Sequence, residues 1–337
     1  MAASEALAWG ATPLVLPEHP TDMDLMRYRV LPEVLLPAGP TTSDENRELG
    51  RALEQFLASG ATEQVEGLEA FADRHPQSPW WTSLQVNLGL VRVRHGYFVR
   101  AMARFRGAWE TGRGLRDPGL SALVDLAVGE YALIYAWCGQ KEELDRLQSE
   151  VGDRPLRGLG GARFAVAMEG REIMAFTPEL SRRCGLYALD AVMGAMQSRR
   201  MSSEAINTVR TTAQGANLVQ LRDYAERQGV ALRAAWRKPG AGMLVPAIFQ
   251  WSLEHFSAVL AIEDARVRVY DRAFDLQRGR DRWLDRAALD EGSTGAFLIP
   301  ASTALPDGWR WMEDSEASSV WGKGSALTTT TPSRAPP

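Results

Sequence analysis

Three residue types that together perform thiol chemistry stand in the second half of the chain, in the order Cys184, His255 and Asp271. Cys184 precedes Gly185 and an apolar stripe at helical spacing, which predicts a helix whose first turn begins at the cysteine. The amide groups at a helix N-terminus favour a thiolate over a thiol, and the thiolate is the nucleophilic form. His255 and Asp271 are then the candidate general base and the group that orients it.

The stretch "HFSAVLAIEDARVRVYD" predicts a β-hairpin with His255 at the start of its first strand and Asp271 at the end of its second. If residues 263–265 form a three-residue loop, position 257 faces position 271. His255 and Asp271 then lie diagonally on one face, with Cβ atoms about 7 Å apart. A two-residue or four-residue loop would place them on opposite faces, so the candidate site depends on this turn.

Each of these residues also has a purely structural interpretation. A lone cysteine on a helix is usually a packing residue, a histidine at a strand start is often held by hydrogen bonds, and Asp271 could simply end a strand. The other cysteine, Cys138, precedes a glycine at a turn between helices and is predicted to be structural. The remaining histidines, with no partner apparent in the sequence, are His19, His75 and His95.

Composition excludes several classes of protein. The 2 cysteines and 4 histidines have no spacing typical of a zinc site, so we expect no metal. "GLGG" at 158–161 lacks the third glycine and the preceding strand of a dinucleotide loop, so we expect no cofactor. A net charge of −4 gives no basic field for nucleic acid or an anionic membrane. With no signal peptide and no apolar run of membrane-span length, the sequence predicts a cytoplasmic protein without a membrane span.

Composition and hydrophobic periodicity divide the chain into four parts. Prolines crowd residues 1–42, which predicts an extended N-terminal arm. Residues 43–151 carry helical periodicity, and 162–312 pass from helix to β-branched runs such as "HFSAVLAIE" and "GAFLIP". Residues 313–337 thin to a polar, Pro-containing end and are predicted to be a disordered tail. Helices followed by strands indicate an α+β fold with an antiparallel sheet, joined to the repeats by a linker, "GDRPLRGLGGARF".

The helical part contains a recurring unit. "LGLVRVRHGYFVRAMARFRGAWE" places small residues and aromatics at the separations of a tetratricopeptide-type hairpin, in which small residues let two helices approach. Weaker echoes lie on either side. About three such hairpins would bury a continuous core, and the array is a candidate for gripping a protein partner.

With these motifs in place, residues 165–300 resemble the C39 family of papain-like cysteine peptidases, bacterial enzymes that trim leader peptides after a double glycine. The resemblance is carried by "RRCGLYAL", "GANLVQLRDYAERQGVAL", "PAIFQW" ahead of "HFSAVL", and "VYDRAF". It implies a peptide or protein substrate, with cleavage after Gly-Gly as one specificity. It also implies that Cys184 attacks the scissile carbonyl, His255 acts as general base and then acid, and Asp271 orients it.

The sequence departs from the family pattern at three places. The family's oxyanion glutamine lies six residues before the cysteine, where this chain has Pro178. Losing one such donor costs on the order of a hundred- to a thousandfold in rate. Arg183 replaces an acidic residue, and Arg272 replaces a proline. Either another donor substitutes, such as the backbone amide of Cys184 with a neighbouring side chain, or the domain is a peptide-binding scaffold that cuts weakly or not at all.

A third hypothesis concerns processing of the chain itself. Gly160-Gly161 lies just upstream of the peptidase-like region and is a candidate self-processing site, although a glycine-rich linker needs no such explanation.

Overall fold

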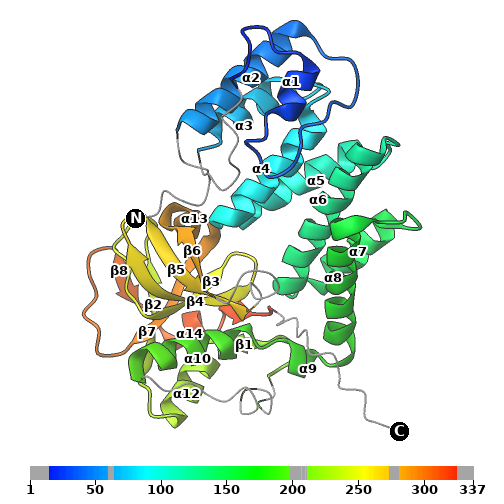
Figure 1. Ribbon diagram of the computed structural model, residues 1–337. Helices are drawn as coiled ribbons and strands as arrows, with labels where there is room; N and C mark the ends of the chain where they lie inside the picture. The colour runs from blue at the N-terminus through cyan, green and yellow to red at the C-terminus, as the bar shows by residue number, and fades with distance from the viewer. Residues whose placement is uncertain are drawn as a thin grey trace.

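The structure, a computed structural model, describes residues 15–59, 64–197, 206, 209, 211–272 and 281–324. A helical array comes first, and helices packed on an antiparallel sheet follow it (Figure 1). The prediction of an α+β chain with an antiparallel sheet is therefore confirmed.

Helices that are neighbours in the chain pack on one another throughout the array. They are α1 (Asp22–Arg27), α2 (Ser43–Ala58), α3 (Glu66–Arg74), α4 (Trp81–His95), α5 (Phe98–Gly112), α6 (Pro118–Trp137), α7 (Lys141–Val151) and α8 (Gly158–Phe176). In the α4–α5 hairpin, a Cβ on Gly89 would lie 2.4 Å from the Phe105 ring, so only glycine allows this close approach. The small residue and the aromatic therefore meet as the spacing predicts.

The N-terminal segment from Val15 to Thr42 covers the first helices of the array. Apart from α1 it is irregular, and Leu25 and Leu35 are buried in one core with residues of α2 to α4. Its backbone is fixed at Leu36, whose N–H donates to Ser83 Oγ at 3.1 Å. The first part of the predicted arm, residues 1–14, lies outside the described residues.

The predicted linker is wrong over its second half, because α8 begins at Gly158 and packs along α6. Glycines make this contact possible: a Cβ on Gly129 would lie 2.3 Å from the Gly160 carbonyl oxygen. The glycine cluster that suggests a flexible linker in the sequence serves close helix packing instead. Gly160 and Gly161 thus stand in the first turn of a packed helix, not in an extended segment that a peptidase could cleave.

Helix α6 is the central helix of the array. Among the described residues it is long and apolar enough to cross a membrane, which differs from the expectation that no stretch approaches that limit. In the structure, 78% of its apolar window is buried inside the protein. Its apolar residues pack against the neighbouring helices α4, α5, α7 and α8.

Antiparallel pairing builds a seven-stranded sheet in the order β6-β5-β4-β3-β7-β2-β8. Its strands are β2 (Leu232–Arg237), β3 (Ala247–Trp251), β4 (His255–Glu263), β5 (Arg266–Tyr270), β6 (Asp281–Asp285), β7 (Ser293–Pro300) and β8 (Trp309–Trp311). The sequence pattern does not predict the two edge strands, β6 and β8, because they are short and partly exposed.

The two faces of the sheet are covered differently. One face carries α10 (Cys184–Gln197) and α12 (Leu218–Arg227), which share a core with alternate residues of the strands. The opposite face packs against α13 (Arg286–Gly292) and against the array, where the Phe98 ring meets Trp251 edge-on at 5.2 Å. The array therefore rests on the sheet directly.

The C-terminal part returns to the middle of the molecule. After β8 the chain forms α14 (Asp314–Ala317) and β9 (Trp321–Gly322), and β9 pairs with β1 (Ala216–Asn217). The part of this segment from β9 to Gly324, red in Figure 1, lies between the sheet and the array. The predicted disordered tail is therefore wrong for residues 313–324, which are packed; residues 325–337 lie outside the described part.

Candidate functional site

Cys184 occupies the first position of α10, as the apolar stripe predicts, and only 5% of its surface is exposed. The short helix α9 (Pro178–Ser181) precedes it, and the Arg183 carbonyl accepts the Tyr187 amide at 3.1 Å to start α10. Because α10 packs on β3 and β4, the cysteine is held against the strand that begins with His255.

The hairpin brings His255 and Asp271 to one face by a different route from the predicted one. The loop has two residues, with Glu263 paired to Arg266 and Asp264 in a left-handed conformation at φ 51°. With that loop and no other irregularity, His255 and Asp271 would lie on opposite faces of the hairpin. A bulge between Val259 and Ala261 shifts the register by one residue, so that Ala258 faces Tyr270 and the required alignment is restored.

The imidazole and the carboxylate form a direct buried contact. His255 Nε2 lies 2.6 Å from Asp271 Oδ2, and the two side chains are 5% and 4% exposed. The other ring nitrogen, Nδ1, has no partner of full hydrogen-bond geometry within the described residues. The Cys184 side chain stands close enough to act on the ring electrostatically and as a hydrogen-bond partner. The structure thus brings all three candidate residues together.

Asp271 is itself fixed by a chain of buried donors that the sequence does not suggest. Ser257 Oγ donates to Asp271 Oδ2, and the indole of Trp251 donates to Ser257 Oγ at 2.8 Å. Serine and tryptophan in a strand look like ordinary packing residues until the register is known. Residues 255 and 257 lie on the same face of β4, so both side chains contact the Asp271 carboxylate.

The charge state of His255 follows from its neighbours. Burial lowers the pKa of the imidazole, but the Asp271 carboxylate and the Cys184 side chain raise it by more, to about 10. At neutral pH the ring is therefore an imidazolium. A cationic imidazole between a carboxylate and a sulfur atom is the arrangement of groups that thiol catalysis uses.

We expect this pair to make the stability of the protein depend on pH in the alkaline range. The pKa of His255 rises from 6.5 to about 10 on folding. The stabilisation is therefore complete below about pH 6.5 and is lost as the pH rises through 10. At about 1.4 kcal/mol per pKa unit, the free energy of unfolding falls by several kcal/mol over this range. Urea unfolding at graded pH measures it.

The matched variant for this measurement is His255→Gln, which keeps a polar side chain but does not titrate. Its free energy of unfolding should lose this component of the pH dependence. A native alkaline decline that persists unchanged in His255→Gln would show that other groups cause it.

Cys138 lies near the same site but in a different state. It is buried in the turn between α6 and α7, where burial, followed by the Asp271 and Cys184 side chains, raises the pKa of its thiol well above the usual value. An uncharged, enclosed thiol suits the predicted structural role. The same turn contacts the sheet domain directly, since Gln140 Nε2 donates to the Leu253 carbonyl at 3.2 Å.

The departures from the family pattern take definite positions. Pro178 opens α9 and brings no side-chain donor. The backbone N–H of Cys184 is available instead, and it donates to the carbonyl of Gly324 at 3.3 Å. Arg183 is buried beside the cysteine, and the Arg272 guanidinium lies over the Tyr187 ring at 4.3 Å.

Two of the remaining histidines do have partners. His75 Nε2 lies 2.9 Å from Glu48, and His95 Nδ1 lies 3.4 Å from Asp285, both within structural contacts. His19 is exposed. Within the described ranges, no group of three or more His, Cys, Asp or Glu side chains is placed to hold a metal ion.

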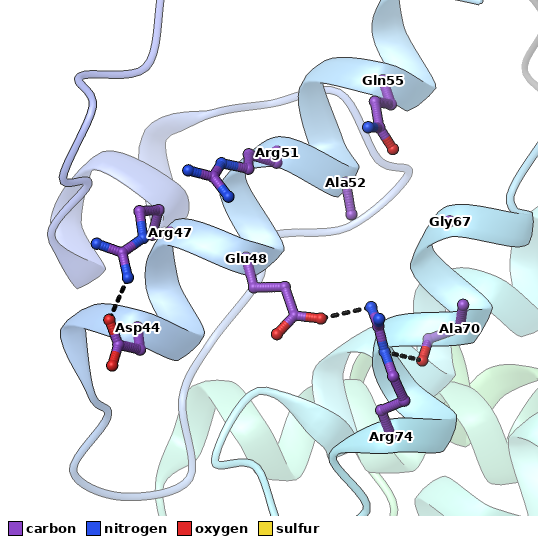
Figure 2. A pocket seen from close by; sticks show the side chains of 9 residues that line it. All are labelled: Asp44, Arg47, Glu48, Arg51, Ala52, Gln55, Gly67, Ala70 and Arg74. Carbon is purple, nitrogen blue, oxygen red and sulfur yellow. Dashed lines mark hydrogen bonds and ion pairs between the residues drawn. The ribbon is translucent and has the colours of Figure 1, made fainter.

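A polar hollow of about 530 Å³ lies between α2 and α3, at the far end of the array (Figure 2). Its lining residues are Asp44, Arg47, Glu48, Arg51, Ala52, Gln55, Gly67, Ala70 and Arg74. Glu48 pairs with Arg74, and Asp44 with Arg47, so much of its charge is compensated internally. It contains no nucleophile and is separate from the thiol site.

Comparisons with known proteins add little to this geometry. No family model matches the chain, and no curated protein matches it. Among solved structures, the chain is similar to a double glycine motif protease from an AMS/PCAT transporter, crystallised in complex with the leader peptide. That match has 18% identity, covers 35% of this chain and 84% of the other, and has a TM-score of 0.30, too low to carry an argument.

Proposed function

We propose that this protein is a cysteine peptidase of the papain-like, C39 type. The observation that supports the proposal is the buried constellation of Cys184 at a helix start, an imidazolium at His255 and the Asp271 carboxylate at 2.6 Å from its ring. Cys184 would attack a peptide carbonyl, His255 would protonate the leaving amine, and Asp271 would hold the ring in place. The substrate class is a peptide or protein segment.

A second candidate function is a peptidase-like scaffold that binds peptides without cutting them, with the helices acting as tetratricopeptide-like repeats that hold a protein partner. Pro178 favours it, because a proline offers no amide donor where the family places its oxyanion glutamine. Against it stands the Cys184 amide, which points at a carbonyl oxygen at 3.3 Å and can replace one donor.

Alkylation by iodoacetamide separates these functions, with Cys138 as the internal control. We expect Cys184 to react faster than Cys138 at neutral pH, because the His255 imidazolium stands beside the Cys184 sulfur, whereas burial raises the pKa of the Cys138 thiol well above its usual value. Peptide mapping after timed labelling of the full chain gives both rates.

The matched variant is His255→Gln, in which labelling of Cys184 should slow, because the cation beside its sulfur is lost. Labelling of Cys184 that is no faster than that of Cys138 in the native chain, or no slower in His255→Gln, would contradict a peptidase and leave the scaffold.

A further inference from the structure

The segment from Val320 to Gly324, which follows the turn after α14, lies along the candidate site as an extended peptide. β9 pairs antiparallel with β1, so that Trp321 faces Asn217 and Gly322 faces Ala216. The Leu218 N–H donates to the Val320 carbonyl at 3.2 Å, and Asn217 Nδ2 donates to the Ser318 carbonyl at 3.1 Å. Strand addition of this kind is a common way in which proteins hold a peptide by its backbone.

The same segment continues to the triad through backbone contacts. Gln250 Nε2 donates to the Trp321 carbonyl, and the Lys323 N–H donates to the carbonyl of Glu254 at 2.7 Å. One residue further, the Gly324 carbonyl accepts from the Cys184 amide at 3.3 Å. Glu254 directly precedes His255. The segment is therefore held by the residue before His255 and by the backbone of Cys184 itself.

The side chains of the segment fit the site closely. The Lys323 ammonium lies 2.8 and 2.9 Å from the two Glu254 carboxylate oxygens. A Cβ on Gly324 would lie 1.7 Å from His255 Nδ1, and one on Gly322 would lie 2.1 Å from the Phe256 ring. Neither position accepts any other residue in this pose.

Two glycines outside the segment complete the enclosure. A Cβ on Gly215 would lie 2.0 Å from the Gly322 carbonyl oxygen, and one on Gly139 would lie 1.9 Å from the Lys323 carbonyl oxygen. Gly139 belongs to the α6–α7 turn, so the helical array supplies one wall of this peptide channel. The backbone carbonyl of Trp137, at the end of α6, also borders Gly324.

A terminal strand that only stabilises the fold has no need to present a carbonyl to the amide of a candidate nucleophile. Here the carbonyl is that of Gly324, and the peptide bond that follows it in the sequence joins Gly324 to Ser325. Since a peptidase holds the scissile carbonyl with backbone donors beside its nucleophile, the contact has the form of a substrate complex.

Resting on the proposed function, we infer that this chain cleaves itself in cis at the Gly324–Ser325 bond, with the sequence Gly322-Lys323-Gly324 as its recognition element. The Cys184 sulfur forms a thioester with the Gly324 carbonyl carbon while the bond to the Ser325 nitrogen breaks. The His255 imidazolium gives its proton to that nitrogen. One water then hydrolyses the thioester: its oxygen enters the Gly324 carboxylate, one of its protons restores the His255 imidazolium, and the other passes through solvent to the new Ser325 amine, which leaves Cys184 as the thiolate.

The recognition element differs from a double glycine, because lysine stands between the two glycines. The Lys323 ammonium pairs with the Glu254 carboxylate, while Gly324 packs against His255 and Gly322 packs against Phe256. It also replaces the Gly160-Gly161 hypothesis, whose residues are packed in helix α8.

The test is intact-mass analysis of the full chain during cell-free synthesis at several protein concentrations. We expect a product ending at Gly324 that forms at a rate independent of concentration. Cys184→Ala and Gly324→Val should stay whole, and Gly324→Ala should be cut at least about a hundredfold more slowly, because a small displacement of the scissile carbonyl is enough to cost this much. Gly114→Ala is the matched control, since a Cβ there meets nothing within 4 Å, and it should be cut at the native rate.

A second arm separates this inference from the proposed function. In the Gly324→Val chain the valine side chain would collide with His255, so its own segment cannot occupy the site. This chain is given a synthetic peptide with the sequence of residues 316–330. If it cuts the peptide while the native chain stays whole, the protein is a peptidase and the cis cleavage is wrong. If neither is cut, both proposals fail. Cleavage at another bond, or a rate that rises with protein concentration, also overturns cis cleavage after Gly324.

Discussion

Replacing Cys184 with alanine is expected to lower the rate of the proposed peptide cleavage on the order of 10⁶-fold, to the limit of detection. The size of this effect follows from losing the nucleophile itself, since the remaining groups of a triad contribute little without it. The assay is hydrolysis of the peptide of residues 316–330, followed by mass spectrometry, with both chains carrying Gly324→Val so that their own segment does not occupy the site. The thermal midpoint of the variant checks that the loss is chemical, because α10 begins at this residue.

Cys138→Ala is the matched control for that variant. It removes the other thiol of the chain from a buried position at the α6–α7 turn and leaves the contact between His255 and Asp271 untouched. We expect cleavage close to the native rate. Residual cleavage by Cys184→Ala within tenfold of native would instead show that another group carries the reaction.

The sequence predicts the candidate site better than it predicts the turn that builds it. Residue types, order and strand periodicity indicate a Cys184, His255 and Asp271 cluster, and the structure brings these residues together. The predicted three-residue loop is wrong, and the contact survives because a bulge near residue 260 offsets a two-residue turn. A bulge adds one residue without a characteristic side chain, so alternation of polar and apolar residues does not reveal it.

Glycines account for the largest misjudgements of the fold. In the sequence, Gly158 to Gly161 fall in the predicted linker, and Gly322 and Gly324 fall in the tail that is predicted from its polar composition. In the structure Gly160 allows α8 to approach α6, and Gly322 and Gly324 lie against Phe256 and His255. Whether a glycine is flexible or tightly packed depends on which distant segment lies against it, and that information is not local to the chain.

Replacing Asp271 with alanine is expected to lower kcat/KM by about 10⁴-fold, the second largest effect in the site. Two losses contribute. The imidazole loses the partner that fixes its Nε2 at 2.6 Å, and it loses the carboxylate that raises its pKa to about 10. The His255 imidazolium then loses its proton at lower pH, so the alkaline limb of the kcat/KM profile should move down from about 10.

Ser257→Ala distinguishes this electrostatic role from a packing role, because it removes a hydrogen bond to the same carboxylate oxygen while keeping the carboxylate. A hydrogen bond to a charged group is worth about 1.5 to 3 kcal/mol, so the loss is expected to be roughly ten- to a hundredfold in rate, well short of the effect of Asp271→Ala. The alkaline limb should stay near its native position. If Ser257→Ala and Asp271→Ala lower kcat/KM equally and neither moves the limb, Asp271 acts only in packing, and the charged state of His255 must come from Cys184 alone.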